Sequence, residues 1–342
     1  MRISVDVGYG FTKAMNEEGK TAIFPSLVAR NPKASFGFNN IKEDYEISLF
    51  EEDSEKAFFV GNSAMTAGAV RQWEEEASKN RNLHVLIATS IAQLTPAKVE
   101  LVDIVVGLPM VFYQDQRKDL EKALESKKLV YQLEGSKKQS VTINSVFVFP
   151  QGAGAYYSTI YDIQGKVRNI DFTTKPIAII DIGYRTTDYL FMTKSIKGII
   201  PRQDMSGSIV DVGMNVAHKE IQGVLKNRVR KEVPIVEIEK ALFWSGGQFI
   251  NKGITIDLKT MQKQSYEELA QKIVAELKQK WGDDINRLAA IVVAGGGGDA
   301  LYPYIVKELP AVIKAENPEF ANAYGYLAAQ AQAQTLQVIN KG

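Results

Sequence analysis

Two eight-residue segments of this sequence, separated by about half the chain, repeat each other. The first reads DVGYGFTK at 6–13 and the second DIGYRTTD at 181–188, so Asp, Gly, Tyr and Thr recur in register and Val is exchanged for Ile. Each segment ends one apolar run and begins another, which predicts a β-hairpin at each place. Two such copies predict two related lobes that face each other across a cleft.

Short apolar runs alternate with helical patterns along the rest of the chain, which predicts an α/β architecture. Several runs are apolar at nearly every position, as central strands covered on both faces are. The predicted strands are 3–7, 22–25, 58–60, 104–107, 146–149, 177–182, 189–192 and 291–294. Helices are predicted at 115–127, at 322–339, and from a capping box at Ser265 and Glu268 onward, where apolar residues continue at every fourth position.

A chain of 342 residues is long enough for two domains. We expect the first to span 1–165, with an inserted subdomain at about 31–80, and to be completed by a C-terminal helix at 321–342. We expect the second to span 166–320, with a helical inserted subdomain at about 206–286.

Composition excludes several classes of function. The 41 Lys and Arg residues nearly balance the 40 Asp and Glu residues, and no strong basic run stands out, which argues against tight direct binding of nucleic acid. Cysteine is absent, so the chain has no disulfides and no thiolate metal sites. No targeting segment and no long apolar window are visible, so we expect a cytoplasmic protein that does not span a membrane.

The two Asp-x-Gly turns carry groups that a nucleotide requires. Asp6 and Asp181 end apolar strands, where a carboxylate can hold hydrated Mg²⁺. Glycine lets the backbone approach a ligand closely, and successive N–H groups at such a turn can converge on phosphate oxygens. Lys13 follows on the next strand, within reach of the same phosphates. One such turn is usually structural, but two copies favour nucleotide binding.

Two further segments carry weaker signals. The strand at 291–294 runs into four glycines and a helix predicted to begin near Asp299. A nucleoside or phosphate packed on this loop would explain the glycines, although a tight strand-to-helix turn is an equal alternative. The loop is neither a Walker A motif nor a dinucleotide fingerprint. Gln151, which follows another strand, can orient a water for attack on a terminal phosphate, or it is a surface residue.

The order of these elements resembles the actin superfamily, and most closely its bacterial filament proteins of the ParM and Alp type. The similar segments sample nearly the whole chain: DVGYGFTK, FPSLVA, FFVGNSA, VVGLPM, FPQGAGAYY, IAIIDIGYRTTD, DMSGSIVDVG, VVAGGGGDAL and FANAYGY. The resemblance implies an actin-like (ribonuclease H-like) α/β fold of two lobes, each with a central mixed sheet and an inserted subdomain. It also implies ATP or ADP, with Mg²⁺, in the interlobe cleft.

The resemblance assigns roles to individual residues. Asp6 and Asp181 would hold the metal, and Gln151 would position the attacking water together with Asp181. Lys13 would contact the β-phosphate. The other nucleotide contacts would come from backbone N–H groups and from the nucleoside pocket: Gly8, Tyr9, Gly10, Gly183, Tyr184, Gly207, Ser208, Gly296, Gly297 and Asp299.

This sequence departs from the family pattern at two places. Tyr184 and Arg185 stand where the family usually has glycine, so their side chains either point away from the nucleotide or alter the γ-phosphate site. Our hypothesis places Arg185 near the phosphates or at a subunit contact. Gln151 stands where ParM has an acidic residue.

The resemblance favours an ATPase that polymerises head to tail into filaments and reaches plasmid DNA through an adaptor protein. Plasmid or chromosome segregation is the favoured role, and cell shape and organelle positioning are alternatives. A small-molecule kinase of the same superfamily is the main alternative activity, although no aspartate is a convincing candidate for its base. A nucleotide switch or chaperone is the third possibility. Neither direct DNA binding nor membrane binding is expected.

Overall fold

The computed structural model describes residues 1–31, 45–51, 54–69, 82–196 and 198–339. The chain forms two compact units, one of Met1–Thr174 with Glu319–Gly342 and one of Lys175–Pro318. Each unit has a mixed sheet and helices, which confirms the predicted α/β architecture. Much of the segment predicted as an inserted subdomain at about 31–80 lies outside the described residues. The predicted domain and subdomain boundaries of both units stay predictions.

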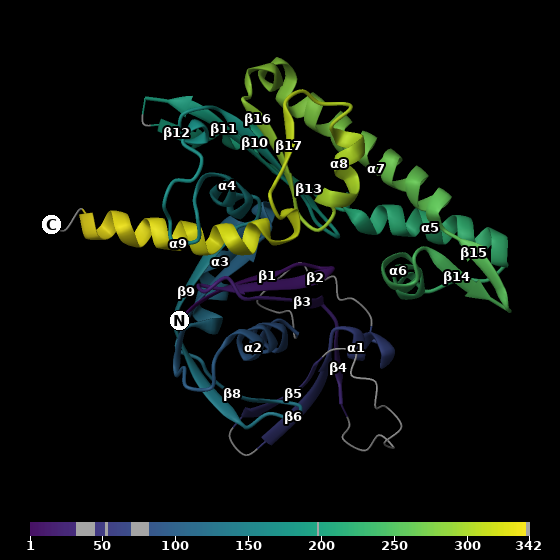
Figure 1. Ribbon diagram of the computed structural model, residues 1–342, viewed down its shortest axis with the longest axis horizontal. Coiled ribbons are helices and arrows are strands. Elements are labelled where there is room, and N and C mark those ends of the chain that lie inside the picture. The colour runs from purple at the N-terminus through teal and green to yellow at the C-terminus, as the bar shows by residue number, and fades with distance from the viewer. Residues whose placement is uncertain (32–44, 52–53, 70–81, 197, 340–342) are drawn as a thin grey trace. The chain divides into compact units, whose positions relative to one another are not determined.

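The first unit contains a nine-stranded sheet in the order β3-β2-β1-β7-β9-β8-β5-β6-β4. The sheet curves around helix α2, and helices α4 and α9 pack on its other face near β1 (Figure 1). The elements are β1 Arg2–Val7, β2 Phe11–Asn16, β3 Thr21–Pro25, β4 Val28–Arg30, β5 Tyr45–Glu51, β6 Ser54–Val60, α1 Asn62–Thr66, α2 Leu83–Leu94, β7 Leu101–Leu108, α3 Met110–Leu124, β8 Lys128–Leu133, β9 Gln139–Pro150, α4 Ala153–Ile160 and α9 Ala321–Ile339.

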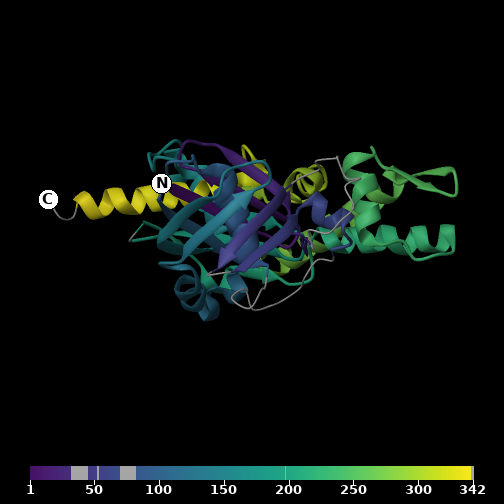
Figure 2. The same cartoon turned by 90° about the horizontal axis from the view of Figure 1, so that it is seen from below.

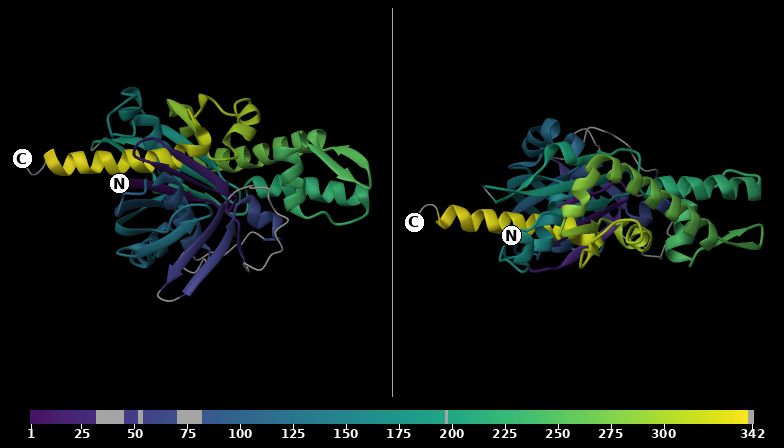
Figure 3. Two further views of the ribbon diagram at one scale, coloured as in Figure 1. Left: turned by 60° about the horizontal axis from the view of Figure 1, so that its bottom comes forward. Right: turned by 90° about the horizontal axis from the view of Figure 1, so that it is seen from above.

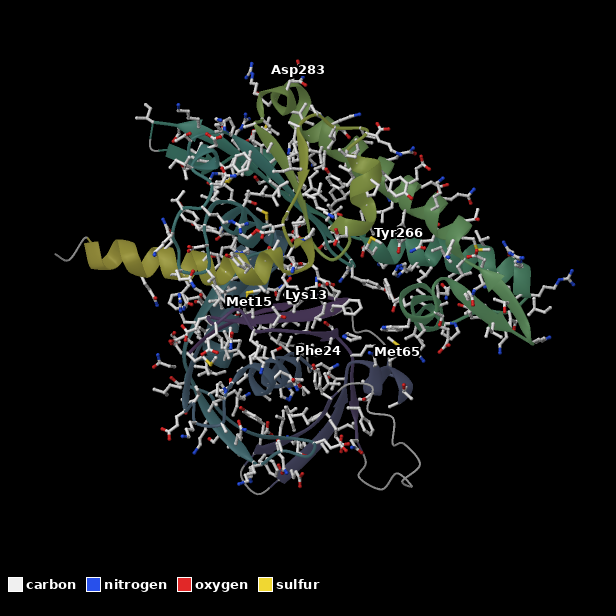
Figure 4. The ribbon with its side chains drawn as sticks, in the orientation of Figure 1. Lys13, Met15, Phe24, Met65, Tyr266 and Asp283 are labelled. Carbon is white, nitrogen blue, oxygen red and sulfur yellow. The ribbon has the colours of Figure 1, made fainter. Side chains whose placement is uncertain are left out.

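Strand β2 shows why both faces of this sheet are apolar. Ala14 belongs to the core cluster around α2, whereas Met15 packs on the opposite side with Phe320, Ala323 and Leu327 at the start of α9. Lys13 lies two residues before Met15 on the same strand (Figure 4), and alternate residues of a strand share a face. Lys13 therefore projects to the side of the sheet that α9 covers.

The second unit contains a sheet in the order β12-β11-β10-β16-β17, with β13 paired to β11. Helices α5 and α6 and the β14–β15 hairpin lie side by side at one end of this unit (Figures 2 and 3). The elements are β10 Ile177–Ile182, β11 Thr187–Ser195, β12 Gly198–Pro201, β13 Gly207–Ile209, α5 Met214–Val229, α6 Ile235–Trp244, β14 Gln248–Asn251, β15 Ile254–Asp257, α7 Lys259–Trp281, β16 Ala290–Ala294, α8 Gly298–Ile305 and β17 Val312–Lys314.

Each predicted strand coincides with an observed one, and both copies of the repeat are antiparallel hairpins, as predicted. Two helix starts were predicted wrongly. Helix α7 begins at Lys259 rather than at Ser265, because Asp257 Oδ1 accepts the N–H of Lys259 at 2.9 Å. Ser265 is buried within the helix and hydrogen-bonds Glu220 instead of capping.

The second wrong start concerns α3, which was predicted at 115–127. The helix begins at Met110, directly after Pro109, whose fixed φ suits a helix start. It ends at Leu124, because Ser126 adopts a positive φ of 60°. The predicted burial of Leu120 and Leu124 is confirmed. Among the described residues, no helix combines the length and the apolar character that crossing a bilayer requires.

Candidate functional site

The first repeat hairpin places an acid opposite a base. The antiparallel register of β1 and β2 pairs Asp6 with Lys13, and the two residues are only 5% and 8% exposed. The turn is closed by the N–H of Gly8, which donates to the carbonyl of Phe11 at 3.2 Å. A Cβ at Gly8 would lie 3.0 Å from the same oxygen, so the turn is tightly packed at this position. The Gly8 N–H, predicted as a phosphate donor, is thus used inside the hairpin.

The Asp6 carboxylate is held by two side-chain amides. Gln151 Nε2 donates to Asp6 Oδ1 at 2.9 Å, and the amide of Asn322 supplies a second hydrogen bond. Burial raises the pKa of Asp6 above its ordinary value, while the charge of Lys13 and the two amide hydrogen bonds act in the opposite direction. The structure therefore brings Asp6, Lys13 and Gln151 together within one unit.

Asn322 was missed as a site residue by sequence reasoning. It lies at the start of α9, and its Oδ1 accepts the N–H groups of Gly152 and Ala155 at the start of α4, each at 3.2 Å. An asparagine where a helix is predicted to begin is a capping signal. Sequence spacing could not show that the helix it caps lies about half the chain away.

The second repeat hairpin has the same internal geometry as the first. The N–H of Gly183 donates to the carbonyl of Thr186 at 2.9 Å, and a Cβ at Gly183 would lie 3.0 Å from that oxygen. Asp181 is 5% exposed and faces Asp188 in the register of β10 and β11. Asp188 accepts from Thr186 Oγ1 at 3.2 Å. The Gly183 N–H is therefore also used inside its own hairpin.

Strand β13 brings Gly207 and Ser208 to this hairpin. Their register partners on β11 are Tyr189 and Asp188. Ser208 Oγ donates to the carboxylate of Asp188, so Ser208 is the nearer of the two to the second turn. Gly207 and Ser208, which the resemblance places among the nucleotide contacts, thus pair directly with the second strand of the hairpin.

The four-glycine loop packs on the strand end that carries Asp181. Gly295 has a φ of +86°, and a Cβ there would lie 2.4 Å from Asp181 Oδ1, so any side chain would displace that carboxylate. The N–H of Gly297 donates to the carbonyl of Ile182 at 2.8 Å. Gly296 is exposed, and Asp299 makes an ion pair with Lys314 at 2.8 Å.

Tyr184 and Arg185 direct their side chains into their own unit. Tyr184 donates to Glu239 Oε1 at 2.5 Å, and the same oxygen lies 3.3 Å from His218 Nδ1. Glu239 and His218 are both almost completely buried. Arg185 Nε donates to Asp211 Oδ1 at 2.9 Å. These contacts tie the second hairpin to helices α5 and α6, and sequence reasoning had left open which way the two side chains point.

The acidic side chains of these turns could hold a metal ion only together with other ligands. Within the described residues no three His, Cys, Asp or Glu side chains converge, so no all-protein cage forms there. Mg²⁺ keeps most of its waters and commonly takes one or two carboxylates together with substrate phosphates. A single buried carboxylate such as Asp6 fits that mode of binding.

Comparisons with known proteins match both units. The N-terminal domain of actin like proteins matches residues 4–154, and the C-terminal domain of the MreB-like archaeal actin homologue matches residues 179–307. An archaeal actin homolog of Thermoplasma acidophilum is 24% identical over 339 residues, which is 95% of this chain and 97% of that protein.

Solved structures match over the same length. A 15-stranded ParM filament from Clostridium botulinum has a TM-score of 0.80 and 26% identity, over 97% of this chain and 99% of that chain. An archaeal actin homolog in complex with ADP has a TM-score of 0.76 and 22% identity, over 96% and 98% of the two chains.

Proposed function

Because the chain belongs to the actin superfamily, we propose that it binds ATP with Mg²⁺, hydrolyses it and assembles into filaments. The matched geometry of the two repeat hairpins supports this proposal most strongly. Each has a buried aspartate at a strand end and a tight turn in which a Cβ on the glycine would lie 3.0 Å from a carbonyl oxygen. A buried carboxylate beside such a turn suits a phosphate ligand with a bound cation.

In the first unit, the Asp6 carboxylate would hold hydrated Mg²⁺ and the Lys13 ammonium would neutralise charge on the β-phosphate. Gln151 would orient the attacking water by accepting one of its protons in a hydrogen bond. The backbone of Tyr9 and Gly10 would contact phosphate, whereas the Gly8 N–H would stay within its turn. The Gln151 amide already lies 2.9 Å from Asp6, which supports a shared role.

In the second unit, Asp181 would act on the water or the metal, and the backbone of Gly183 and Tyr184 would approach the γ-phosphate. The Tyr184 side chain takes no part, since its hydroxyl binds Glu239. The nucleoside would be held by Gly207, Ser208, Gly296, Gly297 and Asp299.

Self-assembly is the second half of the proposal, and the similarity to a ParM filament protein supports it. Head-to-tail contacts that do not close on themselves build an open filament. We propose that the filament works in the cytoplasm and reaches plasmid DNA through an adaptor protein. The balanced charge of the chain, 41 basic against 40 acidic residues, fits an indirect contact with DNA.

Phosphate release from ATP tests the catalytic half. We expect the wild type to release phosphate with Mg²⁺, and Asp181→Ala to lower the rate by about 100-fold or more. Asp283→Ala, at an exposed position (Figure 4), is the matched control and should leave the rate unchanged. Absence of phosphate release from the wild type would refute hydrolysis, and transfer of phosphate to an added sugar or carboxylate would favour a kinase.

A further inference from the structure

Asn322 stands at the point where three segments of the first unit meet. It is the second residue of α9 and is only 5% exposed. Helix α9 crosses α4 so closely that a Cβ at Gly325 would lie 1.7 Å from the carbonyl oxygen of Gly154. This crossing brings the side chain of Asn322 to the first turn of α4, directly after Gln151.

The oxygen of Asn322 completes the start of α4. That helix follows Gly152, which has no side chain to cap it and adopts a φ of 80°. Asn322 Oδ1 accepts the N–H groups of Gly152 and Ala155, each at 3.2 Å, and so replaces the missing cap from another helix. The backbone next to Gln151 is fixed by this contact.

The nitrogen of Asn322 has a different partner, the Asp6 carboxylate on β1, which also accepts from Gln151 Nε2 at 2.9 Å. Asparagine offers both an acceptor and a donor in one short side chain. Aspartate in its place could still accept the two N–H groups, but it would repel Asp6. Alanine could neither accept the two N–H groups nor donate to the Asp6 carboxylate.

We infer that Asn322 is a positioning residue for ATP hydrolysis, which holds the Gln151 segment and the Asp6 carboxylate in one fixed arrangement. This inference rests on the proposed function. Asn322 reaches the reacting atoms only through Asp6 and Gln151, so its loss lowers the rate at saturating ATP more than it weakens nucleotide binding.

Asn16 provides a matched control for the substitution. It is 1% exposed in the same unit, and its Oδ1 likewise accepts two backbone N–H groups, those of Glu18 and Lys20. Its Nδ2 donates to the carbonyl of Leu94 rather than to a carboxylate. Asn16→Asp therefore makes the same chemical change at a comparable buried turn, away from Asp6.

The experiment compares Asn322→Asp, Asn322→Ser and Asn16→Asp with the wild type, below their melting temperatures. For Asn322→Asp we expect kcat for phosphate release to fall about 10- to 100-fold, while KM for ATP changes less than about 3-fold. Asn322→Ser should also lower kcat for phosphate release, and it replaces the aspartate variant in the comparison if that variant fails to fold. Asn16→Asp should lose thermal stability but keep kcat within about 2-fold.

Wild-type kcat in the Asn322 variants, or an equal loss of kcat in Asn16→Asp, would overturn the inference while leaving the proposed function intact. A wild type that binds ATP and releases no phosphate would instead overturn the proposed hydrolysis, and the inference with it.

Discussion

Asp6 illustrates at the residue scale how burial of a carboxyl group opposes its ionisation. Burial raises the pKa of its carboxyl, with Lys13, Gln151 and Asn322 only opposing that effect. The folded chain therefore takes up this proton at a higher pH than the unfolded chain does. At pH values above the folded-state pKa, ionised Asp6 lowers the free energy of unfolding by its full amount. This loss disappears as the pH falls to the ordinary pKa of an aspartate, about 4.

We therefore expect Asp6→Asn to melt higher than the wild type at pH 7, by about 2 °C, in the absence of nucleotide and metal. The difference should shrink as the pH is lowered toward 4. Thermal melting of both proteins across this pH range is the measurement. A variant that melts lower than the wild type at pH 7 would show that the ionised carboxylate stabilises the fold.

A second residue-scale prediction concerns the Tyr184 hydroxyl. Its donation to the buried Glu239 at 2.5 Å is lost in Tyr184→Phe, which leaves a buried carboxylate with one donor fewer. We expect a loss of about 1–3 kcal/mol in the free energy of unfolding, measured with urea. Tyr131→Phe is the comparison, because its hydroxyl donates to the neutral amide of Gln139 at 3.1 Å. A smaller loss in Tyr184→Phe than in Tyr131→Phe would contradict this assignment.

The contacts that the sequence predicts and those that it does not predict differ in the distance along the chain that they span. Asp6, Gly8 and Lys13 lie in one short hairpin, so their spacing predicts their proximity. The contacts of Asn322 with Asp6 and of Tyr184 with Glu239 join residues far apart in the sequence. No periodicity encodes such contacts, and only the packed structure identifies them.

Helices α4 and α9 cross at two glycines, Gly154 and Gly325. A Cβ at Gly325 would lie 1.7 Å from the carbonyl oxygen of Gly154, so Gly325→Ala must push the helices apart. We expect a loss of about 3 kcal/mol in the free energy of unfolding. Gly223→Ala, also within a helix but with no atom within 4 Å of the added Cβ, should instead gain about 0.5–1 kcal/mol. Urea unfolding compares them, and equal stability of the two variants would refute the close crossing.

Elements were predicted well where the apolar pattern is regular and poorly at their ends. The β10 run is buried at every position, and its strand was predicted with the correct limits. The start of α7 was misplaced because Ser265 and Glu268 form a motif that also occurs inside a helix, where Ser265 bonds Glu220. The hydrogen bond to a distant residue therefore determines that Ser265 does not cap the helix.

At the scale of the whole molecule, the internal repeat is the sequence feature that carries most information. Two copies of one hairpin predicted two related units, and two actin-like family models match the corresponding regions, 4–154 and 179–307. Assembly depends on surfaces that have no partner within a single chain. Sequence patterns reflect internal packing, so they carry little information about such surfaces.

Light scattering with parallel phosphate release, after ATP and Mg²⁺ are added to the purified protein, tests nucleotide-driven assembly most directly. We expect scattering to rise first, phosphate release to follow, and scattering then to decline as hydrolysis loosens the polymer. Asp181→Ala should assemble without the phosphate release and without the decline. Scattering that stays flat over a wide range of protein concentrations, with ATP bound, would contradict the account.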